Sequence, residues 1–417
     1  MANNNNKDKC NVPNLRFPEF SGEWEKCKVS ELLDFYSTNS LCWEQLEYDT
    51  ENISNLHYGL IHVGLPTMVN LVQDRLPNIK DGNKPKNYEL CKEGDVAFAD
   101  ASEDTNEVAK AIEFYNLNGR DVICGLHTIH GRDNKDRTVV GFKGYAFSST
   151  AFHNQIRRIA QGTKIYSIST KNFSECYIGI PSKVEQAKIA SLLHLIDERI
   201  VTQNKIIEDL KMLKSAIIEN VFDDKHSERL QLDNVGSYIR GLTYSSNDVV
   251  EHGGTLVMRS NNIVNGSLLD YNNNVVFVNK QMSAEQQLQN GDIVICMANG
   301  SSSLVGKSSF YDGNCHSPIT VGAFCGIYRS KEPIVKWLFQ TNKYRRYIWN
   351  SLQGGNGAIA NLNGEDILNM SFSIPNAPIK DTCVKMLTSV DSALGNNMSL
   401  CALYTLQKQH LLRQMFI

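Results

Sequence analysis

Two long stretches of the chain place apolar residues at alternating steps of three and four residues. This spacing is typical of a helix that packs along its length on another helix. The first stretch runs from Lys183 to Phe222, about 40 residues, which corresponds to a helix of roughly 60 Å. The second stretch follows the same register. We therefore predict two long helices, residues 182–224 and 376–417, that pack along a helix–helix seam.

The residues of the predicted helix–helix seam share one heptad register. They are Ile189, Leu193, Ile196, Ile200, Gln203, Ile207 and Leu210 in the first helix, and Leu387, Val390, Leu394, Asn397, Cys401 and Tyr404 in the second. The polar Gln203 and Lys214 recur in the second helix as Asn397 and Lys408, and polar seam residues fix register at a cost in stability. Antiparallel pairing would bring Gln203 close to Asn397. The alternative is that the apolar face of each long helix packs only on its own domain.

Before each long helix the pattern is mixed and rich in strand-like runs, such as "TLVMRSNNIV", "GDIVICMA" and "VGAFCGIYRS", separated by Gly and Asn turns. We predict two α+β domains, residues 13–181 and 225–375. The polar, low-complexity residues 1–12 are expected to be a disordered tail. Ser182 and Glu185 begin the first helix with the spacing of a capping box, in which the Glu side chain reaches back to the cap.

The two domains are copies of one another. Residues 94–110, "GDVAFADASEDTNEVAK", match residues 291–307, "GDIVICMANGSSSLVGK", without a gap. Residues 161–181 match residues 355–375 in the same way. The matching segments are separated by nearly half of the chain. A separation this long indicates duplicated domains, because the unit of a solenoid is much shorter.

The segment "NGSSSLVGKSS", residues 299–309, has some features of a nucleotide-binding P-loop. A P-loop has four residues between its outer Gly and its Gly-Lys, whereas five lie between Gly300 and Gly306. The matching segment of the first copy has "SEDTNE" there, and its carboxylates would repel a phosphate. We therefore interpret Lys307 as the repeat partner of Lys110 and not as part of an ATPase site.

Composition limits the possible partners. At 417 residues the chain is long enough for two or three domains. It carries 42 Lys and Arg against 45 Asp and Glu, so no global electrostatic field favours nucleic acid, and any such binding would rest on local loops or on basic partner subunits. The 11 Cys are scattered without zinc spacing, and no apolar run approaches the roughly 18 residues that span a membrane. We expect a cytoplasmic protein with reduced thiols and no membrane partner.

Several motifs together resemble the DNA specificity subunit of type I restriction–modification systems, over nearly the whole chain. In the first half they are "NLRFPEFSGEWEKCKVSELL", "GIPSKVEQAKIASLLHLIDERI" and "LKMLKSAIIENVF". In the second half they are "RSNNIVNGSL", "GDIVICMANGSSSLVGK" and "LQKQHLLRQMF". The start of the second helix, "PNAPIKDTCVKML", departs from the pattern because it has no Glu-Gln.

The resemblance implies that the two domains are target recognition domains, each reading one half of an asymmetric, bipartite double-stranded DNA site. The long helices would form an antiparallel coiled coil that acts as a spacer between the domains and gives the molecule approximate two-fold symmetry. It also implies two methyltransferase subunits and nuclease/translocase subunits as partners, which would hold S-adenosylmethionine, ATP and Mg²⁺. The chain itself would not be an enzyme, and it has no Asn-Pro-Pro-Tyr-type motif and no Gly-rich S-adenosylmethionine loop.

Residues that read base edges or hold phosphates are expected on loops rich in Arg, Lys, Asn and Ser. In the second domain the candidates are Arg240, Tyr244, Ser245, Arg259, Asn261, Asn262, Ser301, Ser302, Ser303, Lys307, Lys343 and Arg345. In the first domain they are Lys110, His127, Arg132, Asn154 and Arg157. The alternative for each is an ordinary solvated turn or outer helix face.

Three questions stay open at the level of sequence. His127 and His130 suggest a metal only with carboxylate or Cys support, so a loop role is favoured and no metal is predicted. A related system in which methylation and cleavage share one polypeptide would use a similar specificity subunit. A protein-binding scaffold without DNA would also fit the balanced charge. The target sequence is not predicted.

Overall fold

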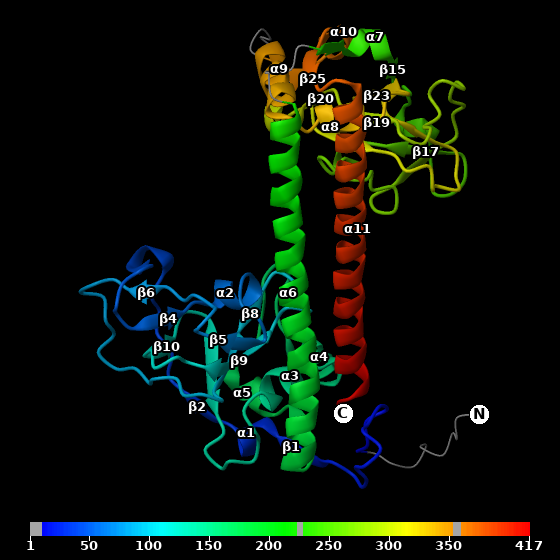
Figure 1. The fold of residues 1–417 in the computed structure, drawn as a ribbon. Helices are drawn as coiled ribbons and strands as arrows, with labels where there is room; N and C mark the ends of the chain where they lie inside the picture. The colour runs from blue at the N-terminus through cyan, green and yellow to red at the C-terminus, as the bar shows by residue number, and fades with distance from the viewer. Residues whose placement is uncertain (1–10, 223–227, 353–359) are drawn as a thin grey trace. The chain divides into compact units, whose positions relative to one another are not determined.

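The computed structural model describes residues 11–222, 228–352 and 360–417 (Figure 1). The chain forms two compact units, which we call the first unit, residues 1–204 with 399–417, and the second unit, residues 205–398. Residues 1–10 of the predicted tail (residues 1–12) and residues 355–359 of the repeated segment 355–375 lie outside the described residues. Among the described helices, none is both long enough and apolar enough to span a membrane.

The first unit is built on two small sheets. One has the strand order β2-β11-β7-β9-β5 and the other the order β10-β4-β6-β3. The strands of the unit are β1 (Glu25–Lys28), β2 (Asp34–Tyr36), β3 (Leu46–Glu47), β4 (Ser54–Leu56), β5 (Met68–Asn70), β6 (Asn78–Ile79), β7 (Val96–Ala99), β8 (Ala101–Ser102), β9 (Ala111–Asn116), β10 (Val122–Cys124), β11 (Thr128–Arg132), β12 (Tyr166–Ser167) and β13 (Tyr177–Ile180). Its short helices are α1 (Val29–Leu32), α2 (Tyr58–His62), α3 (Phe142–Phe147), α4 (Thr150–Ile159) and α5 (Thr170–Ser174).

The second unit has a similar plan, with sheets ordered β15-β23-β19-β21 and β16-β18-β17-β22. Its strands are β14 (Glu228–Gln231), β15 (Gly236–Arg240), β16 (Val249–Val250), β17 (Thr255–Met258), β18 (Val276–Val278), β19 (Ile293–Cys296), β20 (Ala298–Asn299), β21 (Ser308–Phe310), β22 (Ile319–Val321), β23 (Cys325–Ser330), β24 (Ala360–Asn361) and β25 (Ser371–Ile374). Its short helices are α7 (Leu232–Val235), α8 (Val335–Leu338), α9 (Asn342–Leu352) and α10 (Gly364–Leu368).

The strand before each long helix pairs with the first strand of its unit. β13 is antiparallel to β1, with Glu25 opposite Ile180, and β25 is antiparallel to β14, with Glu228 opposite Ile374. The duplication seen in the sequence therefore also holds for strand pairing.

Both predicted long helices are present, as α6 (Lys183–Val221) and α11 (Ala377–Gln414). Within the first unit Asp197 pairs with Lys408, and Asn204 further along α6 meets Cys401 earlier in α11, so the helices run antiparallel (Figure 1). The predicted α+β fold with an antiparallel helix pair is confirmed. All the predicted seam residues are buried or half-buried. The predicted approach of Gln203 to Asn397 stays a prediction.

The apolar faces of α6 and α11 also contact the domain cores. Packing of the two helices on each other and packing of each helix on a domain therefore occur together. The core of the first unit includes Leu193 of α6 with Leu411 and Met415 of α11. The core of the second unit includes Ile218 of α6 and Leu387 of α11. Each core therefore joins portions of both helices to the sheets beneath them.

The two seam lysines have equivalent partners in the two units. Lys408 lies 2.6 Å from a carboxylate oxygen of Asp197 in the first unit, and Lys214 lies 2.7 Å from Asp391 in the second. An aromatic side chain supports each carboxylate, because Tyr145 donates to Asp197 at 2.8 Å and the Trp337 indole donates to Asp391 at 3.3 Å. These lysines are tolerated in the seam because each has its counter-ion on the other helix.

The predicted capping box of α6 is only half correct. The Ser182 hydroxyl accepts the Glu185 N–H at 3.4 Å, as predicted. The Glu185 carboxylate does not return to the cap. It accepts two hydrogen bonds from Arg16, at 2.7 and 2.8 Å, and one from the Trp24 indole at 3.2 Å. A charge-assisted, bidentate contact with Arg is stronger than a bond to one backbone N–H.

Candidate nucleic-acid interface

Three loops of the second unit meet where two parallel strands end. β17 and β22 run parallel and are in register at Met258 and Val321. Leu242, in the loop after β15, donates to the Val321 carbonyl at 2.7 Å, and Gly322 donates to the Met258 carbonyl at 2.8 Å. The segments that follow Arg240, Met258 and Val321 are therefore neighbours.

The turn after β17 separates two asparagines that sequence could not distinguish. Asn262 is buried, accepts the Arg259 N–H at 2.9 Å and donates to the carbonyls of Asp270 and Asn273. Its side chain is buried and holds the loop together, which argues against the predicted DNA contact. Asn261 and Arg259 are exposed on the same turn.

The loop after β19 joins this turn. Asn299 donates to the Ser260 hydroxyl at 3.2 Å, which ties the two loops together. Ser301, Ser302 and Ser303 are exposed, and the hydroxyls of Ser301 and Ser303 are 2.8 Å apart. Short hydroxyl side chains on an exposed loop can donate to and accept from base edges or phosphates.

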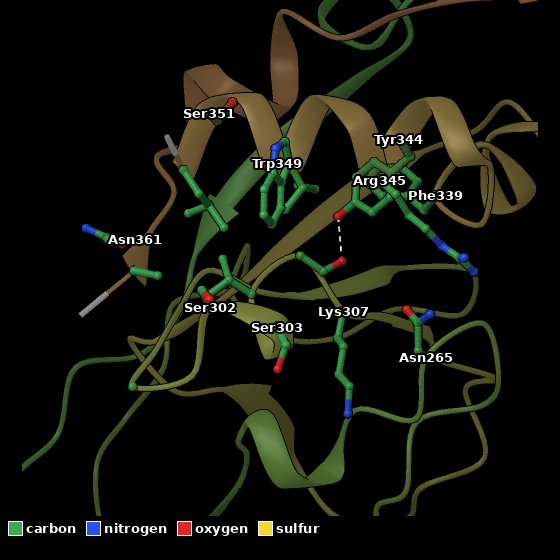
Figure 2. A pocket seen from close by; sticks show the side chains of 16 residues that line it. Asn265, Ser302, Ser303, Lys307, Phe339, Tyr344, Arg345, Trp349, Ser351 and Asn361 are labelled. Carbon is green, nitrogen blue, oxygen red and sulfur yellow. Dashed lines mark hydrogen bonds between the residues drawn. The ribbon is translucent and has the colours of Figure 1, made fainter. Parts of the chain in front are cut away.

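A pocket of about 640 Å³ lies beside this loop (Figure 2). It is lined by Ser302, Ser303 and Lys307 from the loop and by Arg345 and Trp349 from α9. The structure thus brings together two of the predicted basic residues from segments that are distant in sequence. Figure 2 shows the Lys307 amino group pointing away from α9. Lys343 lies on the same helix as Arg345.

The structure also explains the Gly-Lys pair that resembled a P-loop. Gly306 has a positive φ of 80°, and a Cβ there would lie 2.7 Å from Ile348 of α9. Its carbonyl accepts the Tyr344 hydroxyl at 2.7 Å. Because Gly306 has no side chain, the loop can pack closely against α9. Gly306 is therefore explained by packing, and only Lys307 of the Gly-Lys pair remains a candidate for a phosphate contact.

The loop after β15 offers fewer free groups than predicted. Arg240 is exposed at the end of β15. Ser245 donates both its N–H and its hydroxyl to the Asp248 carboxylate, at 2.6 and 2.9 Å, so its hydroxyl is engaged in a turn. Tyr244 is half-buried next to Gly322.

Two exposed aromatic residues of the second unit were missed in the sequence. Phe324 is 67% exposed, and its carbonyl accepts the N–H groups of Met297 and Ala298 at the start of the serine loop. Trp349 is 65% exposed on the wall of the pocket. Exposed aromatic faces can stack on bases or sugars. Their type was visible in the sequence, but their exposure depends on tertiary packing.

In the first unit Lys110 and His127 lie around one loop. Lys110 donates to the His62 carbonyl at 3.1 Å and pairs with Glu107 at 2.8 Å. The His62 ring is 2.9 Å from the Ala101 carbonyl. The side chain of His127 is half exposed, and its Nδ1 is 3.1 Å from Asp100.

A group of stacked rings next to His127 was missed in the sequence. The rings of Trp43 and His57 are 4.5 Å apart, those of His57 and Tyr58 are 4.7 Å apart, and Tyr58 contacts His127 edge-on at 5.2 Å. Burial, together with the neighbouring His127, lowers the pKa of His57. Neutral His57 can stack without charge, while Trp43 and His127 remain exposed.

Asn154 and Arg157, exposed on α4, form a pair. The Arg157 guanidinium donates to the Asn154 side chain at 2.7 Å and to Asn106 at 3.0 Å. Asn106 belongs to the loop that also carries Lys110. Four predicted residues of the first unit, Lys110, His127, Asn154 and Arg157, are therefore attached to one surface loop and its neighbours.

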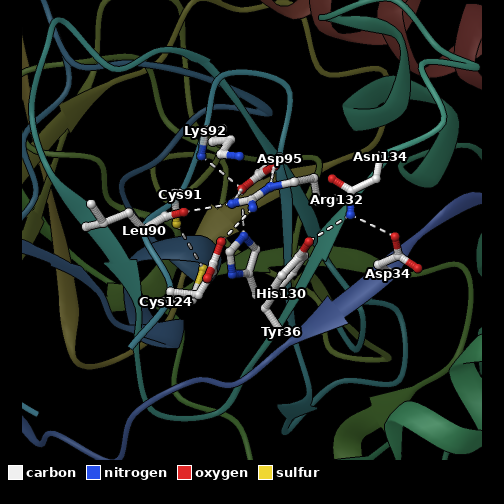
Figure 3. A network of polar contacts seen from close by, with 11 residues as sticks. Asp34, Tyr36, Leu90, Cys91, Lys92, Asp95, Cys124, His130, Arg132 and Asn134 are labelled. Atoms are coloured by element: carbon white, nitrogen blue, oxygen red, sulfur yellow. Dashed lines mark hydrogen bonds and ion pairs between the residues drawn. The ribbon is translucent and has the colours of Figure 1, made fainter. Parts of the chain in front are cut away.

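Arg132 does not belong to this surface. Its side chain is 8% exposed and binds the Asp95 carboxylate through Nε and Nη2, both at 2.8 Å (Figure 3). It also donates to Glu89 at 2.6 Å. A guanidinium held in this way is engaged within the fold, which argues against the predicted DNA contact.

The second unit repeats this buried contact. The Arg329 guanidinium binds Asp292 at 2.8 and 2.6 Å. Asp95 and Asp292 are the acidic residues of the repeated "GD" motif. The motif therefore positions a bidentate Asp–Arg clamp in each unit, and its carboxylates are not available for nuclease chemistry.

Curated proteins of known type match one third of the chain. Over 155 residues it is 35% identical to the type I restriction enzyme EcoKI specificity subunit of Escherichia coli (strain K12). Over 153 residues it is 34% identical to the type I restriction enzyme StySPI specificity subunit of Salmonella potsdam. Each match covers 35% of this chain and 31% of the relative, so it spans about a third of the length of these relatives. No family model matches the chain.

Solved structures match nearly all of the chain in fold. The S subunit of a type I restriction–modification system from M. genitalium superimposes with a TM-score of 0.59 at 14% identity, covering 97% of this chain and 99% of that one. A chain from a structural study of complex assembly in the type I R-M system gives a TM-score of 0.53 at 13% identity, covering 93% and 96%. The chain thus resembles type I restriction specificity subunits in sequence over a third of its length and in fold over nearly all of it.

Proposed function

We propose that this chain is the sequence-specific DNA-binding subunit of a type I restriction–modification complex. Each unit would read one half of a bipartite, asymmetric double-stranded target. The observation that carries the proposal is the duplicated fold, which matches S subunits over nearly the whole chain and presents exposed polar loops in both units. A site in two halves needs two related reading surfaces, and a duplicated chain supplies them.

In the second unit the proposed reading surface is formed by the neighbouring loops after β15, β17 and β19. Asn261 and the exposed serines would read base edges, because amides and hydroxyls both donate and accept. Lys307, Arg259 and Arg240 would hold phosphates. In the first unit Lys110 and Arg157 would hold the backbone, with Asn154 and His127 nearer the bases.

The chain would direct chemistry that partner subunits perform. Two methyltransferase subunits would methylate adenine, and nuclease/translocase subunits would cleave. S-adenosylmethionine, ATP and Mg²⁺ would be bound by these partners. The names of the similar proteins support this assignment, since both curated relatives are specificity subunits and one similar structure concerns assembly of a type I complex.

The separation of the two reading surfaces can be tested by methylation mapping. Asn261→Ala in a complex assembled with its methyltransferase should relax base preference in one half-site and leave the other unchanged, at a cost of about 1–3 kcal/mol for the lost contact. Asn396→Ala, an exposed asparagine on α11, is the matched control and should change neither half-site. Equal relaxation of both half-sites would contradict the proposal.

The phosphate role of Lys307 needs a separate measurement. Lys307→Ala should weaken binding to all sequences alike and reduce the slope of log K against log salt by about 0.9, as the loss of one phosphate contact does. Fluorescence anisotropy over a salt series measures both. An unchanged slope would exclude the contact. If the chain were instead a protein-binding scaffold, the same assay should show no preference for any bipartite DNA sequence.

A further inference from the structure

Three potential metal ligands from separate segments meet inside the first unit (Figure 3). Cys91 lies before β7, Cys124 ends β10, and His130 lies in β11. The two sulfur atoms are 3.6 Å apart, and one ligand atom from each residue lies within 4.8 Å of the others. All three side chains are buried. Nothing in their sequence spacing indicated the cluster.

His130 has an unused nitrogen in this interior. Its Nε2 is 2.8 Å from the Asp95 carboxylate, which can only accept, so Nε2 carries the hydrogen. The other nitrogen, Nδ1, is buried and has no hydrogen-bond partner among the described residues. An unsatisfied buried polar atom is costly and calls for a ligand. A carboxylate that orients a histidine from behind is the usual second contact of a metal-binding imidazole.

We propose that Cys91, Cys124 and His130 bind one Zn²⁺ ion through the two sulfur atoms and the histidine Nδ1. Zn²⁺ prefers thiolate and imidazole ligands in a tetrahedral arrangement. With Zn–S bonds of about 2.3 Å, two sulfur ligands of a tetrahedron are about 3.8 Å apart. The 3.6 Å between the sulfur atoms is close to this separation. A water molecule would complete the coordination, as in other sites with three protein ligands.

The surrounding charges suit a divalent ion. Two thiolates and one neutral imidazole neutralise Zn²⁺. The Asp95 charge is already matched by the Arg132 guanidinium at 2.8 Å. The buried group is therefore electrically neutral when the ion is bound, which limits the cost of removing its charges from water.

The ion would add a bond between two sheets that already share a hydrophobic core. Cys124 belongs to the four-stranded sheet, His130 to the five-stranded sheet, and Cys91 to the segment that leads into β7. His127, at the exposed surface, lies three residues before His130. Zn²⁺ would thus hold together the two sheets that support the candidate DNA surface of the first unit, and its binding energy would add to the folding stability.

Metal content of the full-length chain tests the proposal directly. The chain, purified without chelators, should contain about one zinc ion per molecule by mass spectrometry of the metal. Replacement by Co²⁺ should give the visible and thiolate charge-transfer bands of a cobalt–thiolate site. Cys124→Ser should lose the ion and these bands. Cys296→Ser is the matched control, because Cys296 is also buried and lies opposite Cys325 on a neighbouring strand.

A second measurement separates metal loss from misfolding of the Cys124→Ser chain. The unaltered chain should unfold at a lower temperature after chelation, and added Zn²⁺ should restore the original value. The Cys296→Ser chain should respond in the same way. The proposal is overturned if the unaltered chain takes up neither Zn²⁺ nor Co²⁺, if Cys124→Ser retains the metal, or if Cys91 and Cys124 are recovered as a disulfide.

Discussion

A buried ion pair explains why a lysine lies among the apolar residues of the helix–helix seam. Lys214 lies in the apolar seam of α6 with a side chain only 8% exposed, and its ammonium is 2.7 Å from Asp391. Lys336 approaches the same carboxylate at 2.7 Å. Burial alone would raise the pKa of Asp391, but hydrogen bonds from the two lysines hold it below its usual value, while burial lowers the pKa of Lys214. Asp391 is therefore the counter-ion that makes the burial of Lys214 possible and also pairs with Lys336.

Removing that charge should destabilise the second unit. Asp391→Asn leaves Lys214 buried without its counter-ion, so the free energy of unfolding should fall by roughly 3–5 kcal/mol at pH 7. Because the folded pKa of Asp391 is depressed, its contribution is present above the unfolded value of about 4 and is lost as pH falls through the folded pKa. Urea unfolding at several pH values should show the variant and the unaltered chain converging in acid.

The control for this measurement is Asp381→Asn, an exposed aspartate on the same helix. It should change the unfolding free energy by less than about 0.5 kcal/mol. Equal losses for Asp381→Asn and Asp391→Asn would show that the effect comes from the helix and not from the buried pair.

At this scale the sequence identifies residue types but not their environment. Lys307 and Asn261 could be proposed as surface residues because they lie in Gly- and Asn-rich turns. Arg132 looked equivalent, but its partner Asp95 is distant in sequence and buries it. Asn262 differs from its neighbour Asn261 only because two carbonyls of a later loop lie within reach. Such contacts depend on tertiary structure.

Among the elements, the long helices were the most predictable. Their heptad pattern extends over many turns, and the observed α6 (Lys183–Val221) lies within the predicted range 182–224, of which residues 223 and 224 are not described. The short strands could be recognised as strands, but not paired, because β10 pairs in parallel with β4 and β17 with β22 across long connections. The Cys91, Cys124 and His130 group was hidden for the same reason.

The seam of α6 should be far more sensitive than its outer face. Leu193→Ala removes a fully buried side chain and should lower the free energy of unfolding by about 2–5 kcal/mol. Leu195→Ala is the matched control, since Leu195 is 56% exposed two residues later, and it should cost less than about 0.5 kcal/mol. Thermal or urea unfolding of the two variants compares them directly. Similar losses would contradict the assigned seam.

For the whole molecule, the charge balance limits how DNA could be held. The chain has 42 Lys and Arg against 45 Asp and Glu and a net charge of -3. A chain without excess positive charge attracts DNA only weakly over long distances. Under the proposed function the local loops would supply specificity, and basic partner subunits would supply much of the attraction to phosphates.

This division of labour predicts a difference in salt dependence. The isolated chain should bind its target weakly and with a shallow slope of log K against log salt, since each phosphate contact adds only about 0.9 to the slope. The complex with methyltransferase should bind more tightly and with a steeper slope. Anisotropy titrations of both samples across the same salt range provide the comparison. The same steep slope for the isolated chain would place the phosphate contacts within this subunit.

The composition of the first core has a consequence for how the protein is made. Leu411, Met415 and Phe416 complete that core, and a Cβ on Gly179 would collide with Ile417. These residues leave the ribosome only after residues 11–398 have been synthesised. The core of the first unit can therefore be completed only after the second unit has been synthesised. A ribosome that stops before residue 411 therefore releases a chain whose first unit lacks three of its core side chains, although residues 1–204 are all present.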